Sequence, residues 1–446
     1  MSFELPTNQD KKERQPAVDE QWFDMFERIG SFQDFEYLEG DKKFRENQKN
    51  LFLNEQVRNP ELDYPKLEKF DLEGREEELL KLKKNILENE TNETVQKTYR
   101  WKINQKIAEV RMLKASKNGD PRSFARYSSF IYGEPDKDVF QFDLEEIAEA
   151  IKEKENSDDF RVLFAIRRLK ESLNLDTLSE SSGIEKEFLP HKKRILQYPF
   201  EASKKYNAQE IRNEFSEAMD ELGVEGWQVL VDENIKAISV SQEKKNVRIP
   251  ENKKLTSLEL KKLIAHEIKT HVLRRESGER SKLKLLGLGL DRYLLGEEGI
   301  SAFEEQSIGG SDSFAGFDGH LAISLAVGLD GNKRDFRDVF NILRDFFFIR
   351  SKSKDLQKSW ENAKVGAWNR CVRTFRGTNC SEKGACLTRD IVYREGNINT
   401  WIVIKGNDRE ELKFSVGKYD PANPRHIWIL EQLGISDDDL VQTLDK

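Results

Sequence analysis

Residues 247–271 read VRIPENKKLTSLELKKLIAHEIKTH. The first residues of this stretch alternate apolar and polar side chains, as in a short strand. Thr256 and Glu259 then form a capping box, which predicts the start of a helix. That helix carries two histidines close together, His266 and His271. The stretch therefore predicts a small sheet that leads directly into a long helix bearing a histidine pair.

The spacing of the two histidines sets a geometric condition for metal binding. Imidazole is a common zinc ligand, and Glu267 beside the first histidine could accept a proton from a metal-activated water. In the H-E-x-x-H pattern the two histidines are four residues apart, which places them about 40° apart around an α-helix. His266 and His271 are five residues apart, which in an α-helix would place them about 140° apart. One π-type turn at residues 266–271 would return both to one face. The alternative is that His266 and His271 are ordinary, partly buried histidines.

A third ligand candidate lies 27 residues after His271, in the segment Gly296-Glu-Glu-Gly-Ile-Ser301. Glu298, followed by glycine and an apolar residue, matches the third ligand of many zinc peptidases better than Glu297 does. We expect Gly299 to let its helix approach the histidine helix. The alternative is an acidic first turn, which the helix dipole favours. Taken together, the two motifs favour a metal site.

Periodicity along the chain predicts a mainly helical α+β protein. A polar, lysine-rich mobile tail is expected at residues 1–20, followed by a helical N-terminal lobe at residues 21–200 with a helical hairpin from Asp71 to Asn118. Residues 201–446 are expected to form the catalytic lobe, where strand-like segments precede the histidine helix and helices with a mixed segment follow it.

Composition excludes several functional classes. The 74 Lys+Arg against 82 Asp+Glu give a formal net charge of -8, which argues against a general nucleic-acid binder because phosphate binding needs surplus cations. No apolar run approaches the roughly 18–20 residues of a membrane helix, and the start lacks the pattern of a signal peptide. The sparse cysteines, Cys371, Cys380 and Cys386, suit reduced thiols rather than disulfides or a metal site. We expect a cytoplasmic protein without nucleic-acid or membrane partners.

The motifs around the histidines resemble those of a known family. The chain is similar to the microtubule-associated tyrosine carboxypeptidases and to their bacterial relatives, the flavohaemoglobin expression-modulating QEGLA-motif proteins. The resemblance covers roughly residues 20–435. The length of the chain separately suggests two or three structural units. It rests on H-E-I-K-T-H (266–271), E-E-G-I-S (297–301), Asn59–Pro65, Tyr132–Pro135, Arg373–Gly377 and Leu387–Tyr393.

The resemblance implies both a fold and a reaction. It implies a zincin-like lobe in which His266, His271 and Glu298 hold zinc and Glu267 is the catalytic base. The expected function is that of a carboxypeptidase, which removes the C-terminal residue of a peptide or protein. An aromatic residue is one option for the residue removed. The alternative is a non-catalytic or regulatory protein that retains the metal site.

The C-terminal motifs supply further site candidates. Arg373, Arg376 and Arg389 are candidates for binding the substrate carboxylate, because a planar guanidinium can hold a carboxylate through two hydrogen bonds. Tyr393 is a candidate for stabilising an oxyanion. The equally strong alternative is that these arginines form ion pairs that hold the lobe together.

Overall fold

The computed structural model describes residues 16–435 except 31, 176–180, 185–203, 234, 236, 243, 312, 405 and 406. This part is mainly helical with two small sheets, as the sequence predicts. No helix in it is long and apolar enough to cross a lipid bilayer. Most of the tail expected at residues 1–20 lies outside the described part, and Asp19 within it is buried.

Helices make up the first part of the chain, and α4 and α5 confirm the helical hairpin predicted from Asp71. The helices are α1 (Glu20–Gly30), α2 (Asp34–Tyr37), α3 (Lys42–Leu53), η1 (Leu67–Lys69), α4 (Leu72–Asn89), α5 (Glu93–Lys117), α6 (Pro121–Tyr132), α7 (Lys137–Lys154) and α8 (Phe160–Leu173).

The strands and the remaining helices follow. They are β1 (Lys205–Asn207), α9 (Ala208–Glu221), β2 (Gln228–Asp232), β3 (Ser239–Ser241), β4 (Asn246–Pro250), β5 (Lys254–Thr256), α10 (Ser257–Leu263), η5 (Ile264–Val272), α11 (Leu273–Arg280), α12 (Leu285–Leu288), α13 (Leu294–Gly309), α14 (Phe317–Val327), α15 (Phe336–Arg350), α16 (Leu356–Phe375), η6 (Thr388–Asp390), α17 (Ile391–Ile404), α18 (Asp408–Ser415) and α19 (Pro424–Gln432).

The small sheet expected before the histidine helix is present, and a second sheet of two strands, which the alternation does not predict, accompanies it. One has the strand order β2-β4-β3, with β2 parallel and β3 antiparallel to β4, and the other pairs β1 with β5. The predicted capping box is present, since Thr256 Oγ1 accepts from the amide of Glu259 at 3.3 Å. Buried Ile268 and Val272 of η5 pack against buried Val247 in the same hydrophobic core. The sheet therefore supports the segment that carries the histidines.

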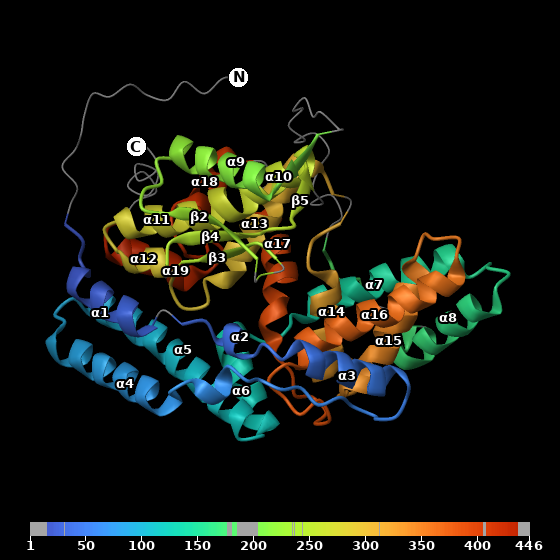
Figure 1. Ribbon diagram of the computed structural model, residues 1–446. Helices are drawn as coiled ribbons and strands as arrows, with labels where there is room; N and C mark the ends of the chain where they lie inside the picture. The colour runs from blue at the N-terminus through green and yellow to red at the C-terminus, as the bar shows by residue number, and fades with distance from the viewer. Residues whose placement is uncertain are drawn as a thin grey trace.

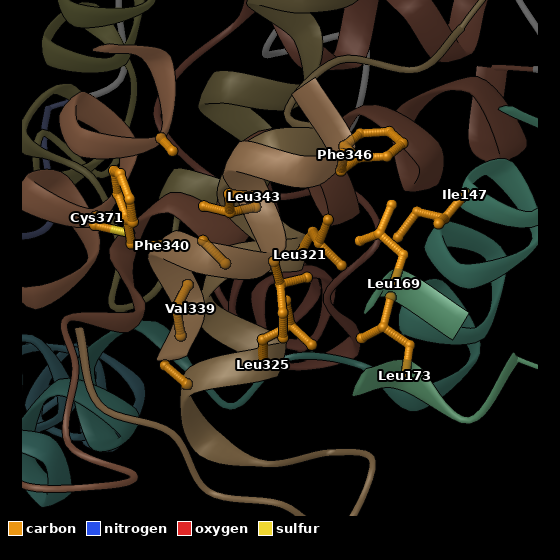
Figure 2. Close-up of a cluster of buried hydrophobic side chains, with 14 of the residues drawn as sticks. Ile147, Leu169, Leu173, Leu321, Leu325, Val339, Phe340, Leu343, Phe346 and Cys371 are labelled. Carbon is orange, nitrogen blue, oxygen red and sulfur yellow. The ribbon is translucent and has the colours of Figure 1, made fainter. Parts of the chain in front are cut away.

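The larger hydrophobic cores join segments that are distant in the sequence (Figure 1). One core packs α1, α4, α5 and α6 against residues 283–290 and α19. Another lies among α7, α8, α14, α15 and α16, where Leu321 lies between Leu169 and Phe340 in the view of Figure 2. The boundary expected near residue 200 lies outside the described residues and stays a prediction. Both cores take side chains from either side of it.

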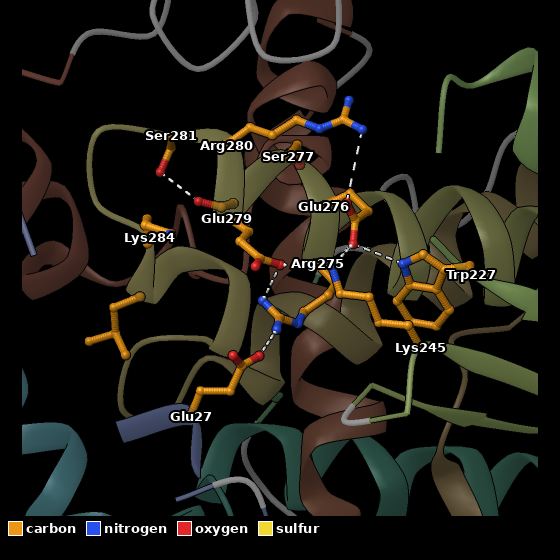
Figure 3. Close-up of polar contacts among 12 residues, drawn as sticks. Glu27, Trp227, Lys245, Arg275, Glu276, Ser277, Glu279, Arg280, Ser281 and Lys284 are labelled. Atoms are coloured by element: carbon orange, nitrogen blue, oxygen red, sulfur yellow. Dashed lines mark hydrogen bonds and ion pairs between the residues drawn. The ribbon is translucent and has the colours of Figure 1, made fainter. Parts of the chain in front are cut away.

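Buried charges hold the helix that continues from the histidine segment (Figure 3). Arg275 of α11 is fully buried and forms an ion pair with Glu27 of α1. Glu276 accepts a hydrogen bond from Nε1 of Trp227 at 2.8 Å and pairs with Lys245 at 2.9 Å. These contacts tie α11 to α1 on one side and to the loops around the sheet on the other.

Two glycines allow α13 and α17 to cross in close contact. A Cβ atom on Gly299 would lie 2.3 Å from the carbonyl oxygen of Gly396, and a Cβ on Gly396 would lie 2.2 Å from that of Leu295. The expectation that Gly299 serves the approach to the histidine helix was wrong, because this glycine faces α17. Sequence spacing could not show this, since α17 begins far downstream.

The crossing predicts a clear cost for a single methyl group. Gly299→Ala should lower the free energy of unfolding by about 1–3 kcal/mol, because the backbone of α17 cannot move aside as a flexible side chain could. Urea unfolding measures this change. Gly366→Ala is the matched control, because its Cβ would meet only the Phe347 side chain, at 3.1 Å. Equal stability of the two variants would contradict the packing described.

Candidate metal centre

The histidine segment is a π-helix, which confirms the widened turn predicted from the spacing. It covers Ile264–Val272 and lies between α10 and α11. The amide of Leu273 donates to the carbonyl of Ile268, five residues earlier. The Thr270 hydroxyl donates to the carbonyl of Ala265 at 3.0 Å, which satisfies a backbone group in the wide turn. Because the turns of a π-helix are wider than those of an α-helix, position i+5 returns towards the face of position i. His266 and His271 can therefore lie on one face.

The π-helix and α13 bring three potential ligands together. One ligand atom from each of His266, His271 and Glu298 lies within 4.8 Å of the others. The two imidazole rings have centroids 5.1 Å apart and an interplanar angle of 71°. Glu298 is buried, whereas the histidine side chains are 22 % and 14 % exposed. These three side chains could therefore hold one metal ion.

Each histidine also contacts a carboxylate on α13 through its other ring nitrogen. Nδ1 of His266 lies 2.6 Å from Oε1 of Glu305, an ion-pair contact without hydrogen-bond geometry. Nδ1 of His271 lies 2.8 Å from Oε1 of Glu297 and is hydrogen-bonded to it. These contacts leave Nε2 of each ring for a metal, and such carboxylates orient metal-bound histidines. Neither role is predicted by the sequence motifs, although Glu305 follows Glu298 by two helical turns.

Glu297 is itself fixed by buried cations. Lys418 Nζ lies 2.5 Å from Oε1 and Arg274 Nη1 lies 2.9 Å from Oε2. Burial alone would raise the pKa of Glu297, but Lys418, Arg274 and His271 hold it well below its usual value. Glu297 therefore stays ionised as the acceptor for His271.

The surroundings raise the pKa of two other groups, Glu267 and His266. Burial raises the pKa of Glu267, and Glu298 adds to this, although the two histidines oppose it. Burial lowers the pKa of His266, but Glu305 and the neighbouring carboxylates raise it to about 9. In the metal-free protein, His266 therefore carries a proton at neutral pH.

The three candidate arginines differ in their partners. Arg373 binds Asp390 through two hydrogen bonds, at 2.8 and 3.0 Å, which favours the structural alternative for this residue. Arg376 has no hydrogen bond or ion pair within the described residues. Arg389 lies over the ring of Phe35 at 4.5 Å, and its ion-pair contact with Asp390 is long, at 3.9 Å. Arg376 and Arg389 are therefore the arginines with capacity for a further anion.

Tyr393 lies near the potential metal ligands. The charge of Glu298 is the main cause that raises the pKa of Tyr393, followed by burial, whereas Arg389 lowers it. Glu298 also acts on the pKa of Arg389, which lies well above its usual value even though burial opposes this. Tyr393, Arg389 and Glu298 therefore lie close enough for their charges to interact.

A buried ion network fixes the start of α17, which carries Tyr393. Arg394 is fully buried and pairs with Asp143 at 3.0 Å. Nδ1 of His320 lies 2.6 Å from Asp143 and its Nε2 lies 3.1 Å from Glu395. Burial lowers the pKa of His320, but the two carboxylates raise it to about 9. The imidazolium thus neutralises two acids that hold α17 to α7 and α14.

One family model matches most of the chain. It is described as microtubule-associated tyrosine carboxypeptidase and matches residues 49–162 and 191–436. The second range contains every candidate metal ligand, Glu267, Tyr393 and the three arginines. No curated protein and no solved structure matches the chain.

The raised pKa of His266 gives a prediction for metal binding. Binding of Co²⁺ at pH 8 should release about one proton from His266, because a protonated imidazole cannot be a ligand. Calorimetry in two buffers with different ionisation enthalpies counts this proton. Glu305→Gln removes the partner that raises the pKa and should reduce the count, whereas Glu361→Gln on α16 should not. A buffer-independent enthalpy for the unmodified protein would contradict the assignment.

Proposed function

The chain belongs to the microtubule-associated tyrosine carboxypeptidase family, and from that premise we propose that it is a zinc-dependent carboxypeptidase. The observation that carries the proposal is the convergence of His266, His271 and Glu298. Two imidazoles and one carboxylate are a ligand set of catalytic zinc sites, which keep one position open. The small sheet, the histidine helix and the second ligand helix support a zincin-like arrangement of this part.

The residues around the ligands account for the steps of peptide hydrolysis. A zinc ion bound there would polarise the scissile carbonyl and lower the pKa of a water molecule. Glu267 would accept a proton from the attacking water and pass it to the leaving amine. Its raised pKa suits a group that must both take and return a proton near neutral pH. Tyr393 would donate a hydrogen bond to the oxygen that becomes negative.

Removal of a terminal residue also requires a group that recognises the C-terminal carboxylate. Arg389 is the better candidate of the two arginines with free capacity, because Glu298 acts on its pKa. No such effect of Glu298 is among the main causes for Arg376, whose pKa is lowered by burial and by the neighbouring arginines. A guanidinium can hold the carboxylate through two hydrogen bonds and so place the last peptide bond at the metal.

The proposed substrate is the C-terminus of a peptide or protein. The family description refers to tyrosine, so we propose an aromatic C-terminal residue as the target. The three cysteines are buried and free, which supports the proposed cytoplasmic setting. A non-catalytic protein that retains the metal site is the alternative, and it would have no need of a carboxylate at position 267.

The metal assignment predicts a separation of binding from catalysis. The purified protein should hold one zinc ion, and His271→Ala should lose most of it because one of three protein ligands is gone. Glu267→Gln should keep the zinc and lose peptide hydrolysis, because the base is absent. Elemental analysis and a peptide-cleavage assay measure the two properties. Full zinc occupancy in His271→Ala would exclude the site.

The carboxypeptidase assignment predicts dependence on a free C-terminus. A peptide with an amidated C-terminus should be cleaved far more slowly than the free acid. Arg389→Ala should lower kcat/KM. The loss of transition-state stabilisation should be about 2–5 kcal/mol, the usual cost of removing one partner of a buried charge pair. Arg126→Ala is the control, since Arg126 is exposed and contacts Tyr127 on α6. Equal cleavage of amidated and free peptides would contradict the assignment.

A further inference from the structure

A pocket lies beside Arg389, and one of its lining residues is on the helix that carries Glu298. Its lining includes Phe32, Phe35, Tyr132, Tyr293, Leu294 and Arg389. Leu294 and Glu298 are four residues apart on α13, so they lie on the same face one turn, about 6 Å, from each other. Tyr293 is also close to this region, because after burial the charges of Glu297 and Glu298 are the main causes that raise its pKa. The pocket is therefore within one residue's reach of the metal centre.

One wall of the pocket comes from outside the matched family region. The family match begins at residue 49, whereas Phe32, Asp34 and Phe35 precede it. This wall is anchored to the helices behind it. The Tyr132 hydroxyl donates to Asp34 at 2.6 Å, and Lys106 Nζ donates to the carbonyl of Phe32 at 2.6 Å. The wall is therefore a fixed part of the pocket.

The pocket offers mostly apolar surface although charged residues border it. Asp34 already accepts a hydrogen bond from the Tyr132 hydroxyl. Lys106 is occupied by Glu109, at 2.7 Å, and by the backbone of the wall. Lys102 and Glu109 also line the pocket, and Lys102 Nζ donates to the carbonyl of Leu290 at 3.3 Å. Most of the accessible lining is apolar, and Phe32, Phe35 and Tyr293 are part of it. Such a lining suits a flat ring and gives little to a small or charged side chain.

Phe35 connects this wall with the proposed carboxylate-binding group. The Arg389 guanidinium lies over its ring at 4.5 Å, which orients the cation and leaves its hydrogen-bonding edge available. The only acidic contact of Arg389 among the described residues is the 3.9 Å one with Asp390. One ring therefore lines the pocket and positions the arginine.

We infer that Phe35, on the N-terminal wall outside the matched family region, is a specificity-determining residue for the C-terminal side chain. In this arrangement the substrate carboxylate binds Arg389 while the side chain of the released residue enters the pocket against the Phe35 ring. Large aromatic residues gain contact there and small ones do not. This inference rests on the proposed carboxypeptidase function.

The test compares peptides that differ only in the last residue, Phe or Ala, using the zinc-loaded full chain. The unmodified enzyme should favour Phe, and Phe35→Ala should reduce the Phe-to-Ala ratio of kcat/KM on the order of tenfold. Phe35→Leu should fall between the two. Phe164→Ala is the matched control, because Phe164 also lies 4.5 Å from an arginine, Arg168, but on α8. An unchanged ratio in Phe35→Ala would overturn the inference while leaving the carboxypeptidase intact.

A binding measurement separates this inference from the proposed reaction. Calorimetry with Glu267→Gln should show tighter binding of the Phe-ending peptide than of the Ala-ending one, and the difference should vanish when Phe35→Ala is added. Equal binding of both peptides to Glu267→Gln would overturn the pocket assignment whatever the turnover. Selective binding without cleavage by the unmodified enzyme would instead overturn the proposed function and leave the pocket as a ligand site.

Discussion

The direction in which His271 points is the constraint on which the candidate site depends. Five residues separate it from His266, and a regular α-helix would turn the two rings to different faces. The π-helix removes this conflict, but it is an uncommon conformation that needs support from its surroundings. The capped helix α10 precedes it, the ion pairs of α11 follow it, and the sheet covers its buried face. These elements together hold both rings towards Glu298.

The remaining site residues depend on a second set of contacts, between α13 and α17. The α13–α17 crossing at Gly299 and Gly396 accompanies a placement of Tyr393 and Arg389 in which the charge of Glu298 acts on both. Buried charges on both helices keep this arrangement, because an ionised side chain in the interior requires a partner. Glu297 on α13 forms ion pairs with Lys418 and Arg274, and Arg394 on α17 forms an ion pair with Asp143.

Local signals allowed the sequence to predict the elements that carry the site. Alternation predicted the strands of the β2-β4-β3 sheet but not β1 and β5. The capping box predicted the start of α10, and the spacing of two histidines predicted the widened turn. Contacts between distant segments could not be predicted in this way. The crossing of Gly299 with α17, the ion pair of Arg373 with Asp390 and the wall formed by Phe35 all depend on tertiary packing. The acidic partner of an arginine cannot be assigned from its neighbours in the sequence.

The central claim is that one metal ion joins the π-helix to α13. Anomalous diffraction at the zinc absorption edge, on crystals of the zinc-loaded protein, tests it directly. We expect a single strong peak beside His266, His271 and Glu298, with the π-helix intact. A peak at other residues, or histidines on different faces of a regular α-helix, would contradict the proposed metal site.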